Sequence, residues 1–130
     1  MNNETTPQGH LTVRTLAMPA DTNPMGDIFG GWLLSQMDIA GGIYTQKISK
    51  GRMVTVAIDS MTFHLPLFVG DTLCCYCNVI KQGRTSISVK IEAWGVRQFQ
   101  DERVKIAEGV FTYVHVDSNR KPVVVLNKSR

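Results

Sequence analysis

A nearly uncharged stretch, residues 28–46, constrains this chain more than any other feature of its sequence. Asp38 is its only charged side chain, and its apolar residues fall on every side of a helical wheel. This pattern predicts a long helix that is buried on all sides, started at Gly26 and Asp27 and ended by the segment 49–51. Because a carboxylate inside a buried helix is costly to desolvate, Asp38 requires a structural or a functional reason.

Composition places the chain among ordinary globular domains. It has 130 residues, of which 43% are hydrophobic and 19% charged, which is enough for one core. We expect a single domain over residues 11–117, with a flexible N-terminus at 1–10 and a polar tail at 118–130. The formal net charge of +3 argues against a dedicated nucleic-acid binder and suits an anionic ligand.

The cysteines and the first ten residues indicate the compartment. Cys74, Cys75 and Cys77 crowd into one expected strand, without a second cysteine pair or a histidine at ligand spacing. Zinc and disulfides are therefore not expected, whereas small core residues in a reducing cytoplasm are. Residues 1–10 lack the basic and apolar regions of a signal peptide. Asp38 and four glycines interrupt the long helix, which argues against a membrane span.

After residue 51 the hydrophobic period changes from that of a helix to that of strands. In the segment 85–96, alternation directs Ile91 inward and Glu92 outward. A slip of the apolar phase around Ser60 predicts a bulge or bend, and Gln82 with Gly83 predicts a tight turn. The expected strands are Leu11–Met18, a long strand over 54–63, Thr72–Lys81, Thr85–Val96 and Val104–Val116.

The last of these strands is apolar on both faces in its second half, with Val110 and Val114 on one and Phe111 and Tyr113 on the other. One helix covers only one face of a sheet, so either this strand lies centrally or a partner subunit covers the second face. Short connections favour antiparallel pairing. The sequence therefore predicts an α+β fold, with the helix laid on a curved antiparallel sheet of about five strands.

The spacing Asn23-x-x-Gly26-x-x-x-Gly30-Gly31-x-Leu33-x-x-x-Met37-Asp38 resembles the signature of the hotdog-fold acyl-CoA thioesterases. Longer blocks resemble the YciA-like branch of that family, and they cover most of residues 11–117. A match of several blocks in order is far more specific than a glycine pair alone. These blocks are RTLAMPADTN, GDIFGGWLLSQMD, GRMVTVAIDSMTF, VGDTLCCY and GRTSISVKIE.

The resemblance implies a hotdog fold, in which a long central helix is wrapped by the sheet. It implies an enzyme of fatty acid metabolism that hydrolyses acyl-CoA to a free carboxylic acid and CoA, without a metal or a separate cofactor. It also implies a homo-oligomer built from dimers, as a hexameric trimer of dimers. Neither nucleic acid nor membrane is an expected partner.

Thioester hydrolysis needs an activated water or a nucleophile, and a donor for the developing oxyanion. Gly30 and Gly31, which lack side chains, would let a substrate carbonyl approach backbone N–H groups at the positive end of the helix dipole. Asp38, about two turns further on, suits a general base or a nucleophile. Gly31 is the catalytic candidate among the backbone N–H donors. The resemblance makes Asp38 the catalytic carboxylate, and it makes Asn23 of a neighbouring subunit the residue that positions water or substrate.

Phosphate-binding candidates lie at the expected turn near Gly83. Arg84 beside this turn, with Lys81 and Arg52, suits an extended anionic ligand. By resemblance, the residues that contact CoA are Gly26, Gly30, Ser60, Thr62, Arg84, Thr85 and Ser86.

Each candidate also has a purely structural explanation. Asp38 would serve as a buried carboxylate bonded to backbone, and Asn23 as a turn residue. The glycine pairs 30–31 and 41–42 would allow close packing of the helix. We assign no catalytic role to the second pair. His64, as a lone histidine, is more often structural than a base, which disfavours a histidine-based hotdog dehydratase.

Two functions from different classes remain. The first is an acyl-CoA hydrolase, and the second is a non-catalytic hotdog module that binds acyl-CoA as a ligand sensor. The presence of both Asn23 and Asp38 favours the enzyme, because a pure binder needs no buried carboxylate beside its thioester.

Overall fold

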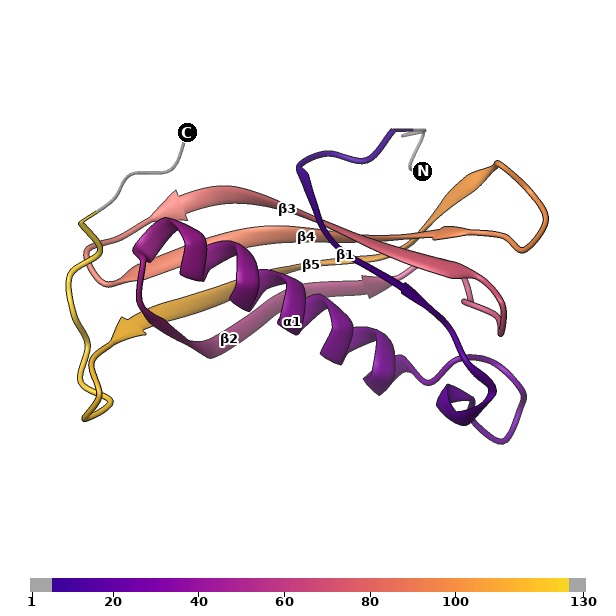
Figure 1. Cartoon of the computed structure of the whole chain (residues 1–130), viewed down its shortest axis with the longest axis horizontal. Helices are drawn as coiled ribbons and strands as arrows, with labels where there is room; N and C mark the ends of the chain where they lie inside the picture. Colours follow the sequence, from indigo (N-terminus) through magenta and orange to yellow (C-terminus); the bar gives the residue numbers. More distant parts are fainter. Residues whose placement is uncertain (1–5, 127–130) are drawn as a thin grey trace.

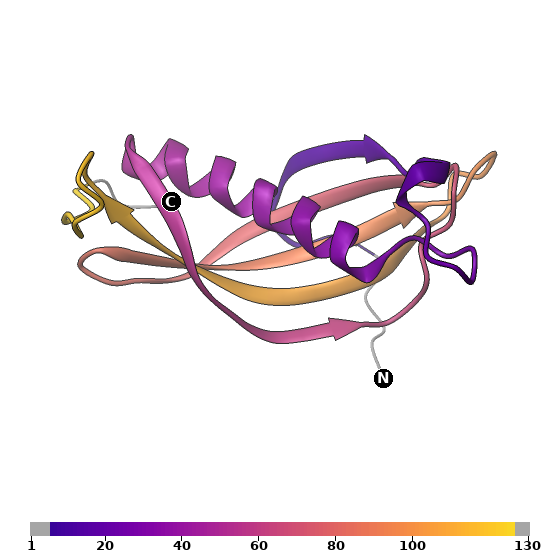
Figure 2. The same cartoon turned by 90° about the horizontal axis from the view of Figure 1, so that it is seen from below.

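A computed structural model describes residues 6–126 of the chain. One long helix lies across one face of a five-stranded sheet, in the strand order β1-β3-β4-β5-β2 (Figure 1). All neighbouring strands are antiparallel, and the sheet curves around the helix (Figure 2). This confirms the α+β prediction. The elements are β1 His10–Leu16, the 3-10 turn η1 Pro19–Asp21, α1 Gly30–Ser49, β2 Arg52–Phe63, β3 Thr72–Gln82, β4 Ser86–Val96 and β5 Arg103–Val116.

Helix α1 starts later than its sequence suggests. Its N-cap is Phe29, which makes no side-chain capping bond, and no acidic residue lies in the first turn. The prediction that Gly26 and Asp27 start the helix is therefore wrong. Asp27 belongs instead to a closed loop, in which its carbonyl accepts the N–H of Asn23 at 2.7 Å. The predicted end is confirmed, since Lys50 is the left-handed C-cap with φ 60°.

One face of α1 is buried and the other is exposed in the single chain. Met37 and Ala40 are fully buried against the sheet, whereas Ile39 is 50% exposed and Ile43 is 39% exposed. The prediction of a helix buried on all sides is therefore wrong for one chain. The distribution of apolar residues around the helix does not show which of them pack against the chain's own sheet and which form an exposed apolar face.

The sheet follows the predicted alternation, with a bend where the phase slips. Ile87, Val89 and Ile91 of β4 are fully buried in the core. The register of β2 against β5 shifts between Asp59 and Thr62, where Ser60 takes a positive φ of 53°, which confirms the predicted bulge. Strand β5 lies between β4 and β2, so the central position predicted as one alternative is confirmed.

Segments outside the strands extend the core. Val125 is only 6% exposed, and its N–H donates to the carbonyl of Arg84 at 2.7 Å. The three cysteines are buried and free of disulfides, as expected of core residues. The expectations for residues 1–5 and 127–130 lie outside the described residues. Within residues 6–126, no helix has the length and apolar character needed to cross a membrane.

Candidate functional site

Asp38 lies on α1 above the two strands β2 and β5, which hold its carboxylate. Thr55 Oγ1 of β2 donates to Asp38 Oδ1 at 2.7 Å, and the Tyr113 hydroxyl of β5 donates to the same oxygen at 3.0 Å. Thr55 and Tyr113 face each other in the β2–β5 register. Two opposed strands therefore fix one oxygen of the single carboxylate on the helix.

Tyr113 is a core residue with a polar end. It is 1% exposed, and its hydroxyl also lies 3.0 Å from the backbone carbonyl of Asp38. Burial raises the pKa of Tyr113 well above its usual range, and the nearby Asp38 carboxylate raises it further. The phenol therefore stays protonated and acts as a donor.

The two glycines in the middle of α1 differ in their surroundings. A Cβ on Gly41 would overlap the hydroxyl and ring of Tyr113, which confirms the interpretation of Gly41 as a packing glycine. A Cβ on Gly42 would meet no heavy atom within 4 Å, so the same interpretation does not hold for Gly42 in the single chain.

The start of α1 presents backbone donors. The first backbone hydrogen bond of the helix runs from the N–H of Leu33 to the carbonyl of Phe29 at 3.1 Å. Within the described residues, the N–H groups of Gly30 and Gly31 have no acceptor. A Cβ on Gly31 would meet nothing within 4 Å, and one on Gly30 only the Phe63 ring at 3.8 Å. Close packing therefore does not explain this glycine pair, whereas approach of a ligand would.

Asn23 has a structural role in the single chain. Its side-chain oxygen accepts the N–H groups of Met25 at 2.9 Å and Asp27 at 3.1 Å, as in an Asx turn. Gly26 completes this turn with φ 91°, a conformation that favours glycine, and donates to the carbonyl of Asn23 at 3.0 Å.

A pocket of about 310 Å³ lies between the start of α1 and the end of β2. It brings together Asn23 and Gly30, but Asp38 and Gly31 do not line it. The lining residues are Asn23, Asp27, Ile28, Gly30, Leu33, Phe63, His64, Leu65, Pro66 and Leu67. This pocket therefore does not unite Asn23 and Asp38.

The predicted CoA contacts fall at two ends of the sheet. Ser60 and Thr62 are exposed on β2, just before the residues that line the pocket. Arg84, Thr85 and Ser86 lie at the β3–β4 turn, at the opposite end of the sheet from the start of α1 (Figure 1). This turn is closed by a bond from the N–H of Gly83 to the carbonyl of Ser86 at 2.8 Å.

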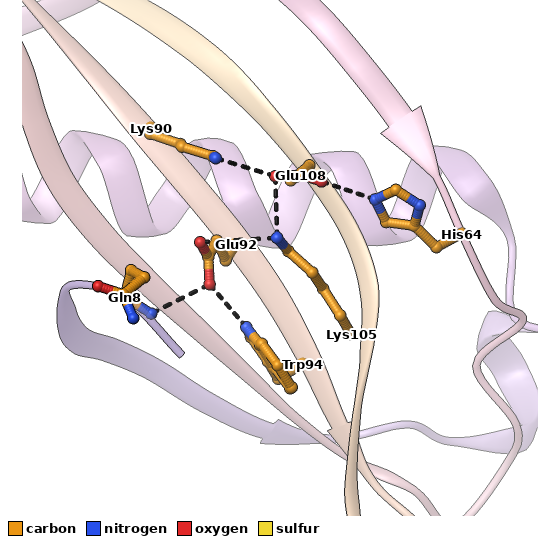
Figure 3. Close-up of polar contacts among 7 residues, drawn as sticks. All are labelled: Gln8, His64, Lys90, Glu92, Trp94, Lys105 and Glu108. Carbon is orange, nitrogen blue, oxygen red and sulfur yellow. Dashed lines mark hydrogen bonds and ion pairs between the residues drawn. The ribbon is translucent and has the colours of Figure 1, made fainter. Parts of the chain in front are cut away.

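His64 belongs to a charged network on the face of the sheet turned away from α1 (Figure 3). Its Nε2 lies 2.7 Å from Glu108 Oε2, and Glu108 Oε1 also pairs with Lys90 at 3.1 Å and Lys105 at 3.0 Å. Burial alone would raise the pKa of Glu108, but hydrogen bonds from Lys105, His64 and Lys90 lower it to about 2. His64 thus has the structural partner that was expected of a lone histidine.

Glu92 departs from its predicted exposure within this network. It points away from the helix as expected, but it is 1% exposed rather than solvated. Its Oε1 accepts the N–H of Gln8 at 3.1 Å and Trp94 Nε1 at 2.9 Å, while Oε2 lies 3.7 Å from Lys105 Nζ. Neighbouring side chains and the N-terminal segment cover it, which the strand pattern does not reveal. Among the described residues, no group of histidine, cysteine, aspartate or glutamate side chains could hold a metal ion.

Sequence reasoning missed Thr55 and Tyr113 as neighbours of Asp38. A threonine in an alternating strand carries no signal of its own. A tyrosine on the core face of a strand carries a weak one, because a buried phenol usually has a hydrogen-bond partner.

Known proteins resemble this chain over almost its whole length. A family model described as the thioesterase superfamily matches residues 25–97. The acyl-CoA thioester hydrolase YciA of Salmonella typhimurium is 54% identical over 92% of this chain and 92% of its own. A hexameric thioesterase of Yersinia pestis has a TM-score of 0.88 and 54% identity, covering 92% of this chain and 98% of that one. A hexameric hotdog fold thioesterase of Campylobacter jejuni has a TM-score of 0.84 and 39% identity, covering 90% of each chain. This chain belongs to the thioesterase superfamily and is a YciA-like, hotdog-fold acyl-CoA thioesterase.

Proposed function

We propose that the chain hydrolyses acyl-CoA to a free carboxylic acid and CoA, with Asp38 as the catalytic carboxylate. The observation that supports this mechanism is the hydrogen bonding of that carboxylate. Its Oδ1 accepts both Thr55 and Tyr113, whereas no hydrogen bond among the described residues engages Oδ2. A carboxylate anchored by one oxygen is oriented and still able to react through the other.

The reaction can be written with Asp38 as base or as nucleophile. As base, it takes a proton from water while the water oxygen attacks the thioester carbon. As nucleophile, it forms a mixed anhydride that water then hydrolyses. In both routes the C–S bond breaks, CoA leaves as a thiolate that is then protonated, and one water is consumed.

Backbone donors at the start of α1 would stabilise the oxyanion formed on the thioester carbonyl. The unbonded N–H groups of Gly30 and Gly31 lie at the positive end of the helix dipole, with open space around Gly31. We assign Gly31 to this role, as its lack of a side chain at the start of the helix suggests.

The active site is proposed to be shared between subunits. Asn23 lines a pocket that Asp38 does not reach, and the relatives from Yersinia pestis and Campylobacter jejuni are hexameric. The exposed apolar side of α1 and the edge strand β2, which exposes 55% of Val56, provide a surface for a second copy. A homo-oligomer, as a hexamer built from dimers, would set Asn23 of one subunit beside Asp38 of the other.

A shared site would also explain the position of the phosphate-binding candidates. Arg84, Thr85 and Ser86 lie far from the start of α1 in their own chain. A two-fold axis perpendicular to the strands reverses their direction in the second chain, so it would bring the β3–β4 turn of that chain toward this end. We propose that this turn, with Gly26, Gly30, Ser60 and Thr62, contacts CoA.

The test is Asp38→Asn, which keeps the size of the side chain and removes its charge. The purified variant should fold and assemble as the wild type does, yet lose about a thousandfold or more in kcat for acyl-CoA in a thiol-release assay. Near-normal turnover would remove Asp38 from the mechanism. For an active enzyme, a single turnover in ¹⁸O-labelled water identifies the nucleophile route when the label enters Asp38, because water then attacks the Asp38 carbon of the anhydride. The base route labels only the product acid.

The same assay separates the enzyme from a ligand sensor. A sensor would bind acyl-CoA without releasing thiol from any member of a substrate panel. The family to which the chain belongs, together with the anchored carboxylate, favours the hydrolase.

A further inference from the structure

We infer that Tyr113 is a positioning residue for Asp38, whose hydroxyl holds Oδ1 and thereby makes Oδ2 the reacting oxygen. This inference deepens the proposed function and rests on it. Tyr113 comes from β5, far from Asp38 in the sequence, and it has no place in the motif that carries the family resemblance.

The contact geometry fixes the side chain of Asp38 against its own backbone. The Tyr113 hydroxyl lies 3.0 Å from Oδ1 and 3.0 Å from the carbonyl oxygen of Asp38. Both acceptors belong to one residue, so only a narrow range of side-chain torsions satisfies them together. Thr55 adds a second donor to Oδ1 at 2.7 Å. The carboxylate is therefore held with Oδ1 toward the sheet and Oδ2 away from these donors.

Tyr113 is suited to be a constant donor. Burial, then the Asp38 charge, raises the pKa of its hydroxyl. The titratable groups that act on it are Asp38 on α1 and Cys77 on β3, and both disfavour its ionisation. A protonated phenol facing a carboxylate makes a charge-assisted bond, which is stronger than a neutral one.

The helix is built to admit this hydroxyl. A Cβ on Gly41 would overlap the Tyr113 hydroxyl, so glycine stands where the phenol passes beneath α1. The carbonyl of Gly41 accepts Thr45 Oγ1 at 2.8 Å, so its own hydrogen bonding does not depend on Tyr113. Glycine in a helix interior is less favourable than alanine, and here it allows the contact with Asp38.

The inference predicts a specific kinetic defect in Tyr113→Phe. The ring and its packing remain, but Oδ1 loses one of its two donors. We expect kcat to fall about tenfold, as for the loss of a hydrogen bond to a charged group, with KM unchanged within about twofold. The acidic limb of the kcat/KM profile should move to higher pH, because a lost donor no longer favours the ionised carboxylate.

The matched control is Tyr44→Phe. Tyr44 lies on α1 itself, is half-buried and stacks on His10 with ring centroids 6.1 Å apart, away from Asp38. Loss of its hydroxyl should leave kcat and the pH profile unchanged. Thermal unfolding of both variants shows whether stability alone accounts for any difference.

A double mutant tests whether Tyr113 acts through Asp38. Adding Tyr113→Phe to Asp38→Asn should cause no further loss of kcat, because the carboxylate that Tyr113 positions is already gone. An additional tenfold loss would overturn the inference, since Tyr113 would then act elsewhere. A wild-type kcat and pH profile in Tyr113→Phe, alongside an inactive Asp38→Asn, would also overturn it while leaving the proposed function intact. An active Asp38→Asn would instead overturn both.

A second replacement keeps the test available if Tyr113→Phe does not fold. Incorporation of 3-fluorotyrosine at position 113 retains the hydroxyl and makes it a more acidic donor. The acidic limb should then move to lower pH, opposite to the effect of phenylalanine. An unchanged limb in a folded fluorotyrosine protein would contradict the inference.

Discussion

At the scale of single residues, the charged network around Glu108 offers a measurable link between structure and pH. The Glu108 carboxylate pairs with Lys90, Lys105 and His64, and the Glu108 side chain is 20% exposed. These partners hold the pKa of Glu108 at about 2, below its usual value of 4.5. The folded state therefore binds this proton less readily than the unfolded state, so Glu108 stabilises the fold above a pH of about 4.5.

Glu108→Gln should destabilise the protein at neutral pH and have little effect in acid. We expect Tm to fall by roughly 5 °C at pH 7, and the difference from wild type to shrink as pH drops from about 4.5 toward 2. Thermal unfolding across this range checks the sign. Glu102→Gln, which changes an exposed glutamate at the end of the β4–β5 loop, is the control and should show no such pH-dependent difference. A constant difference down to pH 2 would contradict the account.

At the scale of elements, α1 carries two adjacent glycines with opposite surroundings. Gly41 faces the Tyr113 hydroxyl of β5, whereas Gly42 faces open space in the single chain. Alanine raises the helix propensity equally at both positions, so any difference between the two substitutions in their effect on stability comes from packing.

Gly41→Ala should destabilise the protein by about 1–3 kcal/mol through overpacking. Gly42→Ala should instead stabilise it by about 0.5–1 kcal/mol, because alanine favours the helix and meets no neighbour within its own chain. Denaturant unfolding of the pair gives both values. Equal destabilisation in both variants would show that the requirement for glycine does not come from Tyr113.

At the scale of the whole molecule, the single chain leaves two halves of the proposed site apart. Asn23 lines the pocket at the start of α1, and Asp38 lies over β2 and β5. Ile39 on α1 and Val56 on the edge strand β2 are exposed apolar residues. In the proposed function, a second subunit that covers them completes the site.

Complementation between two inactive variants tests this arrangement. Asn23→Ala and Asp38→Ala should each be inactive alone, but a mixed dimer contains one site with both lesions and one intact site. Co-refolding equal amounts should therefore restore about a quarter of wild-type activity by random pairing across a two-fold interface. If Asn23 and Asp38 of one subunit served the same site, the mixture would remain as inactive as its parents.

The sequence by itself determined the elements and the family to which the chain belongs. Periodicity identified the long helix, the strands and the bulge at Ser60, because the spacing of apolar residues along a helix or strand is a local property of the chain. The lone charge of Asp38 in an apolar helix marked it as the candidate carboxylate, and the spacing from Asn23 to Asp38 identified the family.

Only the tertiary structure decided what surrounds these residues. Helix α1 starts at Gly30, later than predicted, because a hydrogen bond from the N–H of Asn23 to the carbonyl of Asp27 closes a loop just before it. The partners of Asp38 depend on strand register and on where the helix crosses the sheet. Tyr113 reaches Asp38 only because β5 lies centrally and Gly41 leaves room for its hydroxyl. Local patterns predict which face of an element is apolar, but long-range packing decides which polar groups meet across it.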